Sequence, residues 1–383
     1  MRRTNPRPVA VGRAVVVATG VGLVIACNAL VSLDRCTSDA DCPTGAACDP
    51  DGRFCIKYVF DAAPSDAPVD TNVADAGADG SDASDAGLDV DATPPPCNRS
   101  ARFGTPALVR GTESLQIYSA RFAPDEKTML FSAQNGGPEE FRADLFYASR
   151  SDLTSAFAVS GPIPVVNCDQ ASDYWPTISA DGKLLFFESS RALAPVDGGC
   201  GREHARVWSA TRVNTVADFD PPKLQSTFAI DGSIGEGAPY LHPGGRSLYF
   251  SSFDRGGHGG ADIFVAQLNE LGLVTAIENV DAINTATGEN EPVVTLDDTV
   301  LYFSRETPVT ILRHIFVSTR PTPAGTFGPA TEVTELQGPF EDFPSWISDD
   351  QCRIYFISTR PAAGDDAGDA GPAPYRLWVA ERP

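Results

Sequence analysis

The chain has 383 residues, of which 42% are hydrophobic and 9% aromatic, so it is long enough to bury at least one substantial core. Its 34 glycines and 31 prolines are many for a helical protein, while 21 phenylalanines and 9 tyrosines favour strands. The formal net charge of -22 makes nucleic acid an unfavourable partner and leaves a polycation or a metal cation open. Nine cysteines are many for a reducing compartment and indicate export.

The N-terminus has the pattern of a bacterial lipoprotein signal peptide, which we expect to cover residues 1–26. Three arginines within the first seven residues precede an uncharged apolar stretch, residues 14–26, that ends directly before Cys27. Cleavage there would make Cys27 the lipidated first residue and anchor the exported chain to a membrane. Asn28, where an Asp would indicate inner-membrane retention, favours the outer membrane. The alternative is an uncleaved anchor helix that runs to about Leu33.

Residues 27–60 hold the lipidation site and a cysteine-rich segment with the spacing C-x5-C-x5-C-x6-C. A segment this short cannot build a hydrophobic core, so two disulfides would have to hold it together, in one of three connectivities. A zinc site is the competing interpretation, although the C-x2-C spacing typical of zinc ligands is absent. The four residues are Cys36, Cys42, Cys48 and Cys55.

Residues 61–96 contain nine Asp and no Lys or Arg, with Ala, Gly, Ser and Pro making up most of the rest. A segment of this composition cannot offset the entropy of ordering, and its like charges repel one another, so it is expected to be a disordered spacer. A calcium site is the alternative, but neither an EF-hand loop nor a glycine-rich nonapeptide repeat is present.

Residues 97–383 contain five copies of one strand-rich unit. A strand with an aromatic centre recurs after a turn that contains Asp or Gly, and a further strand and a looser fourth element complete each unit. The unit recurs every 53 to 63 residues. A repeat of that length that consists of strands alone predicts an all-β fold, a five-bladed β-propeller. The aromatic centres are Phe131, Phe187, Phe250, Phe303 and Phe356.

The two ends of the repeat region predict how the ring closes. The region begins with the fourth-strand element, residues 103–109, and stops after a third strand, so the first segment is free to complete the last blade. Six blades are the alternative, if residues 211–233 hide a degenerate unit. Two disulfides are expected, a clasp at the joined ends and a second pair beside the hairpin of unit two. They would be Cys97 with Cys352 and Cys168 with Cys200.

The unit resembles the TolB-type, WD40-like β-propeller repeat. Residues 239–252 (PYLHPGGRSLYFSS) and 262–264 (DIF) are close to its consensus, roughly P-x-x-S-P-D-G-x-x-L-Y-F-S-S-x-R followed by D-I-Y. The resemblance covers about 280 of the 383 residues and is weakest in unit one, where Ala120 replaces the first proline and Glu126 the turn glycine. It implies the propeller fold and an envelope protein as partner, and it constrains function only loosely.

Four acids recur three positions before the first proline of units two to five and are the candidate site residues. If they face one another at one mouth of the ring, they could bind a cation or act as glycosidase carboxylates, and Trp175 and Trp346 beside them hint at a carbohydrate platform. However, an arginine recurs in the same four units, and unit one lacks both the acid and the arginine, which favours a structural ion pair in each blade. The acids are Asp173, Glu236, Glu289 and Glu341, and the arginines are Arg191, Arg255, Arg305 and Arg360.

The sequence therefore favours a non-enzymatic, cell-envelope lipoprotein whose propeller is a protein- or glycan-binding platform. The alternative is an extracellular polysaccharide hydrolase that uses the four acids. No metal or cofactor is expected, because the four histidines lack metal-binding spacing and neither a phosphate-binding loop nor a nucleophile elbow is present.

Overall fold

A computed structural model describes residues 97–135, 142–193, 199–228, 235–307, 312–362, 365 and 374–383, together with two short strands nearer the N-terminus. The chain divides into two units, Met1–Val59 and Phe60–Pro383. In the first unit, β1 (Ala47–Cys48) pairs antiparallel with β2 (Cys55–Ile56). The predicted signal peptide, Cys27, Cys36, Cys42 and the spacer over residues 61–96 lie outside the described residues. The described part of the chain has no helix that is both long enough and apolar enough to span a bilayer.

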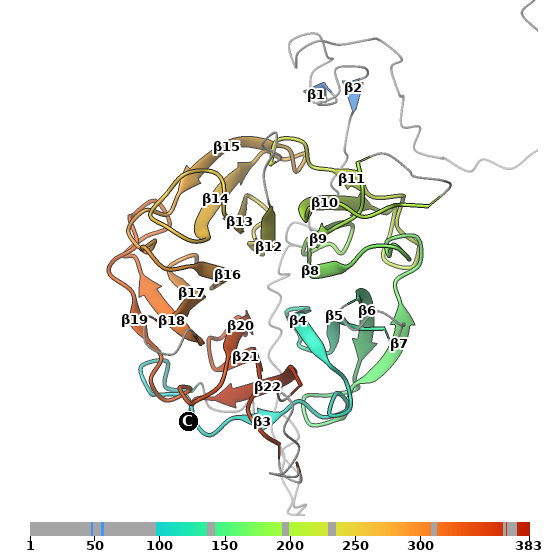
Figure 1. Cartoon of the computed structure of the whole chain (residues 1–383). Helices are drawn as coiled ribbons and strands as arrows, with labels where there is room; N and C mark the ends of the chain where they lie inside the picture. Colours follow the sequence, from blue (N-terminus) through green and yellow to red (C-terminus); the bar gives the residue numbers. More distant parts are fainter. Residues whose placement is uncertain are drawn as a thin grey trace, which may run out of the picture. The chain divides into compact units, whose positions relative to one another are not determined.

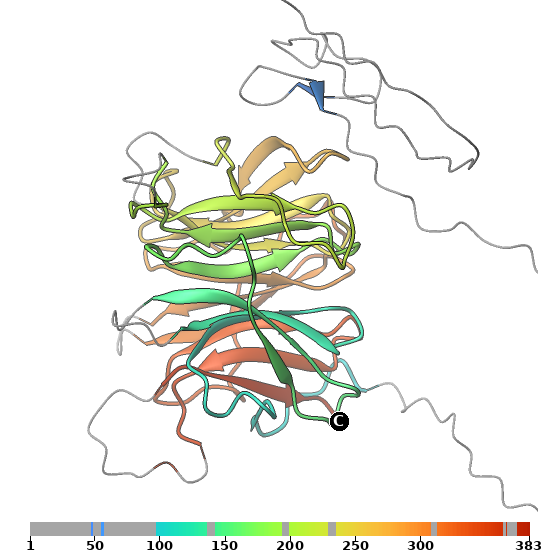
Figure 2. The same cartoon turned by 90° about the vertical axis from the view of Figure 1, so that its right-hand side faces the viewer.

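The second unit is an all-β propeller of five four-stranded antiparallel sheets arranged in a ring (Figure 1). Figure 2 shows the same structure from the side. The fold predicted from the repeat is confirmed. Blade 1 contains β4 (Ile117–Phe122), β5 (Thr128–Gln134), β6 (Ala143–Ser149) and β7 (Ala158–Pro162), and blade 2 contains β8 (Asp173–Ile178), β9 (Leu184–Ser189), β10 (Arg206–Thr211) and β11 (Lys223–Leu224). Blade 3 contains β12 (Glu236–Leu241), β13 (Ser247–Ser252), β14 (Asp262–Leu268) and β15 (Val274–Asn279). Blade 4 contains β16 (Glu289–Val294), β17 (Val300–Glu306), β18 (Arg313–Thr319) and β19 (Thr331–Glu332), and blade 5 contains β20 (Asp342–Ile347), β21 (Arg353–Ser358), β22 (Arg376–Glu381) and β3 (Ala107–Leu108).

The repeated aromatic residues form the core of each blade. All five second-strand phenylalanines are at most 1% exposed. In three blades this ring stacks on a phenylalanine of the third strand; for example, the ring centroids of Phe131 and Phe146 are 5.4 Å apart. Burying a ring of this size removes a large apolar surface from water, which explains why each unit keeps the aromatic strand.

The ring closes through the N-terminal end of the repeat region. β3 pairs with β22, and the backbone N–H of Val109 donates to the carbonyl of Leu377 at 3.0 Å. A disulfide joins Cys97 to Cys352, with 5.8 Å between their Cα atoms. The expected closure by residues 103–109 is confirmed and the six-bladed alternative is wrong, because the described residues between β10 and β12 add only β11 to the ring.

An arginine–phenylalanine contact repeats in four of the five blades and was not anticipated from the sequence. An arginine after the third strand lies over a phenylalanine that precedes the fourth strand, with its guanidinium carbon 4.2–4.5 Å from the ring centroid. Three of the pairs have the spacing R-x6-F, which is the signal that the sequence carries. The pairs are Arg150–Phe157, Arg212–Phe219, Arg320–Phe327 and, across the closure, Arg382–Phe103.

Candidate functional site

The innermost strands β8, β12 and β16 each begin at one of the predicted acids. All three carboxylates belong to residues that are 0% exposed, and each forms an ion pair with the arginine of its own blade. A carboxylate bonded to a guanidinium in a buried site is held in place by charge-assisted hydrogen bonds. The pairs are Asp173–Arg191 at 2.8 Å, Glu236–Arg255 at 3.1 Å and Glu289–Arg305 at 2.7 Å.

Each of these arginines is also tied to the preceding loop and to the aromatic strand. Arg191, for example, donates to the backbone carbonyl of Val166, and its guanidinium carbon is 5.2 Å from the ring of Phe187. The corresponding arginines of blades 3, 4 and 5 donate to carbonyls in the same way and lie over the equivalent rings. The acid–arginine pairs of blades 2 to 4 therefore fasten the innermost strand of each of these blades to the loop that leads into it.

In blade 5 the acid that pairs with the arginine is Asp342. The prediction of Glu341, made by counting three positions back from Pro344, is wrong. Asp342 lies 2.7 Å from Arg360 and is 1% exposed. Glu341 lies one residue outside the strand, and its carboxylate accepts a hydrogen bond from the Tyr375 hydroxyl. The reason is the position of the proline, because Pro344 lies 12 residues before the aromatic centre Phe356, whereas the prolines of blades 2 to 4 lie 11 residues before theirs. The acid itself keeps its place, since Asp342 pairs with Ser358 as Glu236 pairs with Ser252.

Burial affects the charge state of these acids as well. It raises the pKa of Asp173 above its usual range, although Arg191 opposes the shift, and it raises the pKa of Asp342 against the opposing effect of Arg360. The arginines therefore offset the desolvation of the carboxylates in part, which is the behaviour of structural ion pairs in a protein interior.

Around the ring axis, near the start of the innermost strands, four partly exposed aromatic residues form a continuous arc over blades 2, 1 and 5. We call this set the axial aromatic arc. Neighbouring ring centroids are 5.2, 5.3 and 5.9 Å apart, and the last ring also lies 5.7 Å from buried Phe343. From one end of the arc to the other, with each ring contacting the next, the residues are Trp175, Tyr174, Tyr118 and Tyr375.

Two carboxylates that the sequence analysis did not single out lie at the arc. Glu188 and Glu291 line one small cavity of about 180 Å³ together with Trp175 and Arg313. Glu291 is 4% exposed, accepts a hydrogen bond from the Ser304 hydroxyl and has a carboxylate oxygen 3.8 Å from Arg313. Burial raises its pKa.

Glu188 is the more perturbed of the two. As a residue it is partly exposed, but its carboxylate accepts the N–H of Ala238 at 3.1 Å, and a side chain at Gly237 would collide with that carboxylate. Burial raises the pKa of Glu188 to about 8, and the nearby charge of Glu291 adds to the increase. The sequence held one signal for it, since Glu188 follows the aromatic centre of its strand where the other units have Ser or Ile.

The remaining predicted residues lie apart from the arc. Trp346 is 5% exposed and faces a different cavity, at the opposite end of the innermost strands. His258 pairs with Asp281 at 2.7 Å, and His314 pairs with Glu332. Within the described ranges no three His, Cys, Asp or Glu side chains converge in a way that would hold a metal ion. The second predicted disulfide, Cys168–Cys200, is present, with 6.1 Å between its Cα atoms.

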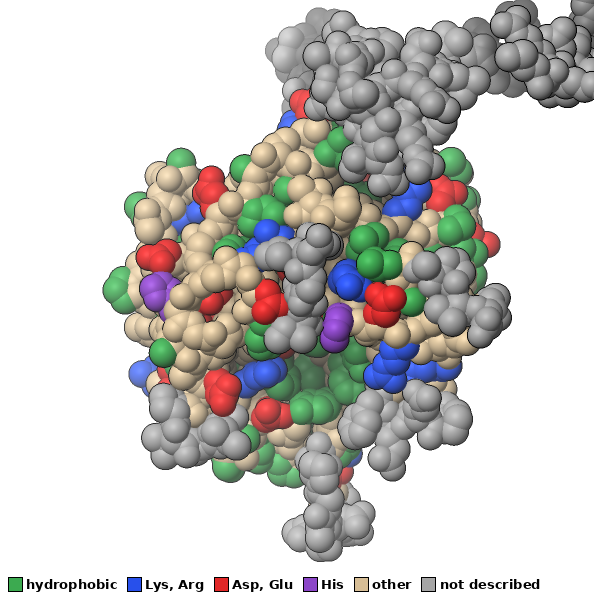
Figure 3. Space-filling view, turned by 45° about the horizontal axis from the view of Figure 1, so that its top comes forward, with side chains coloured by type: hydrophobic (Ala, Val, Ile, Leu, Met, Phe, Trp, Pro, Cys, Tyr) green, Lys and Arg blue, Asp and Glu red, His purple; other side chains and the backbone are tan. Residues whose placement is uncertain are grey.

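Figure 3 shows one face of the propeller, on which hydrophobic side chains line a central hollow with acidic and basic side chains around it. A surface of this kind combines apolar contact area with hydrogen-bonding groups, as binding sites for small molecules commonly do.

The fold can be compared with known proteins. No protein-family model matches the chain, and no curated protein sequence matches it significantly. Among solved structures, TolB from Acinetobacter baumannii is 14% identical with a TM-score of 0.40, over 69% of this chain and 54% of TolB, so the chain spans about half the length of that protein. The GH43_1 enzyme from Xanthomonas citri is 15% identical with a TM-score of 0.48, over 74% of this chain and 91% of that enzyme. The alpha-L-arabinofuranosidase PaAbf62A from Podospora anserina is 11% identical with a TM-score of 0.46, over 76% and 99% of the two chains. The likeness is one of fold.

Proposed function

We propose that this chain is a lipid-anchored binding protein of the cell envelope, whose propeller recognises a glycan at the axial aromatic arc without cleaving it. The arc is the observation that carries the proposal. Four partly exposed aromatic residues at one end of the ring axis offer flat apolar faces, against which the C–H faces of sugar rings pack.

Hydrogen-bonding groups surround the same rings. Glu188 and Arg313 line the small cavity beside Trp175, and the carboxylate of Glu341 is bonded to the hydroxyl of Tyr375. Carboxylates and guanidinium groups accept from and donate to sugar hydroxyls, and a few such groups among aromatic walls fix the orientation of a ligand. The mixture of these groups favours a glycan over an apolar peptide.

The anchor rests on the sequence and on the compartment that the cysteines indicate. The disulfides of the propeller are typical of an oxidising compartment, which agrees with export. We therefore place the protein at the envelope, anchored through Cys27, with residues 61–96 as the spacer between membrane and propeller.

A hydrolase is the second candidate function, and Glu188 favours it. A carboxyl group with a pKa near 8 is protonated at neutral pH, which is what a general acid requires, and Glu291 lines the same cavity as a possible second carboxylate. The acids predicted for this role from the sequence are instead occupied by arginines in blades 2 to 4.

Affinity electrophoresis of the full chain through gels that contain defined soluble polysaccharides tests the proposal. We expect at least one polysaccharide to retard the protein, Trp175→Ala and Tyr118→Ala to abolish the retardation, and no new reducing ends to appear. Tyr147→Ala, a half-buried tyrosine outside the arc, is the matched control and should bind normally.

Two results would contradict the proposal. Retardation that survives both aromatic substitutions would place the binding elsewhere. Release of reducing ends that is lost in Glu188→Gln would favour the hydrolase.

A further inference from the structure

Near the C-terminal ends of the innermost strands, five side chains occupy equivalent positions around the ring axis. In each blade this residue lies directly opposite the residue that precedes the aromatic centre of the second strand. The five side chains therefore form one layer. Only one of them is charged. The layer consists of Arg121, Thr177, Tyr240, Val293 and Trp346.

Arg121 is a buried cation with unused donors. It is 3% exposed, and its Nη1 donates to the carbonyls of Ala120 and Ser345. Its Nε and Nη2 have no partner among the described residues, which also offer it no ion pair. Its guanidinium carbon lies 5.0 Å from the ring centroid of Tyr240.

Keeping the buried guanidinium of Arg121 charged costs free energy. Burial lowers its pKa to about 10, and its interactions with Tyr240 and with Glu291 of blade 4 oppose the shift only in part, so the group stays protonated at neutral pH. A buried charge without a counter-ion and with unsatisfied donors is disfavoured, and protein interiors normally pair such groups. An anion beside Arg121 would remove this cost.

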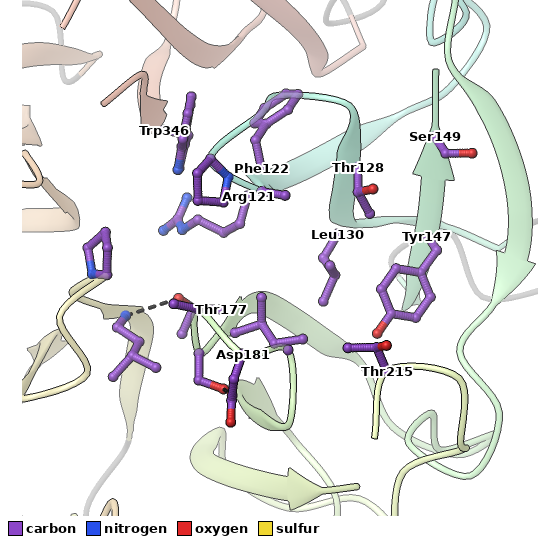
Figure 4. A pocket seen from close by; sticks show the side chains of 18 of the residues that line it. Arg121, Phe122, Thr128, Leu130, Tyr147, Ser149, Thr177, Asp181, Thr215 and Trp346 are labelled. Carbon is purple, nitrogen blue, oxygen red and sulfur yellow. Dashed lines mark hydrogen bonds between the residues drawn. The ribbon is translucent and has the colours of Figure 1, made fainter. Parts of the chain in front are cut away.

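The side chain lines a cavity that could admit one. The cavity has a volume of about 540 Å³ and opens between blades 1 and 2, and most of the surface around it is apolar. Figure 4 shows the guanidinium of Arg121 extending between Trp346 and Thr177, with Leu130 and Tyr147 on the opposite side of the space. A volume in this range holds a small organic molecule.

The rim of the cavity limits the charge of its ligand. Asp181 and Asp349 line it at the hairpin turns of blades 2 and 5, and burial and neighbouring acids raise the pKa of Asp349. Arg212 also lines the cavity, but it is bonded to the carbonyl of Gly182 and packed on Phe219. Two acids at the rim disfavour multiply charged anions such as phosphate and are tolerable for a single negative charge.

We propose that this cavity binds a monocarboxylate with an apolar body, whose carboxylate pairs with Arg121 and whose body packs against Leu130, Tyr147 and Trp346. The site is separate from the axial aromatic arc and does not depend on glycan binding. A free carboxylic acid and the C-terminal carboxylate of a polypeptide share this chemistry.

Isothermal titration calorimetry of the full chain with phenylacetate, phenylacetamide and inorganic phosphate tests the proposal. We expect phenylacetate to bind, and its neutral amide to bind about tenfold to a hundredfold more weakly, because a charge-assisted pair is lost. Phosphate should not bind. Gly-Gly-Phe with a free or an amidated C-terminus distinguishes the two sources, because the free tripeptide should bind more tightly than phenylacetate only if the natural ligand is a chain terminus.

Variants locate the binding. Arg121→Gln should reduce phenylacetate affinity to that of the amide, and Arg121→Lys should retain part of the difference. Arg246→Gln is the matched control, since this arginine is exposed and pairs with Glu270 on blade 3. Ser149→Phe narrows the cavity from its exposed rim without touching Arg121, so it remains informative if Arg121→Gln does not fold.

Three outcomes would overturn the proposal. The first is equal affinity for phenylacetate and phenylacetamide. The second is that neither phenylacetate nor Gly-Gly-Phe with a free C-terminus binds at millimolar concentration. The third is unchanged phenylacetate binding in both Arg121→Gln and Ser149→Phe.

Discussion

The two neighbouring acids of blade 5 offer a direct test of the acid–arginine pairs. Asp342→Asn keeps the shape of a residue that is 1% exposed and removes the carboxylate 2.7 Å from Arg360. Glu341→Gln changes the adjacent, partly exposed acid, whose carboxylate accepts the Tyr375 hydroxyl, and an amide oxygen can accept the same bond. The second variant is therefore the control for the first.

The expected magnitudes follow from what each variant leaves behind. Removing one partner of a buried ion pair costs about 3–5 kcal/mol, because the other charge is left uncompensated. Arg360 would keep its bonds to the Leu336 carbonyl and the Ser358 hydroxyl, so we expect Asp342→Asn to cost about 2–4 kcal/mol. Glu341→Gln should cost less than about 1 kcal/mol.

Guanidinium chloride unfolding under non-reducing conditions, followed by tryptophan fluorescence, measures both free energies. The midpoint should fall for Asp342→Asn with an unchanged dependence on denaturant. Adding Arg360→Met to Asp342→Asn should recover part of the loss, because the uncompensated charge is then absent. Equal destabilisation by the two single variants, or a cost below about 1 kcal/mol for Asp342→Asn, would refute the structural role.

Two further predictions concern Glu188 and Cys27. The pKa of Glu188 is raised from 4.5 to about 8, so its protonation contributes stability that is fully present below pH 4.5 and lost as pH rises through 8. The wild-type protein should therefore lose at most about 5 kcal/mol between pH 5 and pH 9 relative to Glu188→Gln, measured by unfolding at both pH values, and parallel pH profiles would contradict this. Cys27→Ser should abolish incorporation of labelled palmitate in a bacterial host and release the protein from the membrane fraction, whereas unchanged labelling would exclude lipidation at Cys27.

The fold was predictable because every blade buries the same kind of strand in the same way. Each unit must bury an aromatic strand between neighbours, so the same residue types recur at the same register and the repeat is legible in one sequence. Ring closure was legible for the same reason, since residues 103–109 carry a fourth-strand pattern with no blade of their own.

The candidate site was much less predictable, because its residues are the ones that depart from the repeat. Counting from the prolines identified three of the four acids and missed Asp342, since Pro344 lies one position earlier in its strand than the prolines of blades 2 to 4. Glu188 and Glu291 come from blades 2 and 4, and only the closed ring brings them into one cavity. No spacing within one unit encodes that convergence.

The disulfide that closes the ring also determines how the propeller bears a load. A pull on the chain at Cys97 would otherwise act on the backbone bonds of residues 98 and 104 and on the two-residue β3, a set that peels one bond at a time. The disulfide diverts that tension to Cys352, in the hairpin turn between β20 and β21 of blade 5. If the chain is anchored on its N-terminal side as proposed, the tension therefore passes through a covalent bond to the β20–β21 hairpin and bypasses β3.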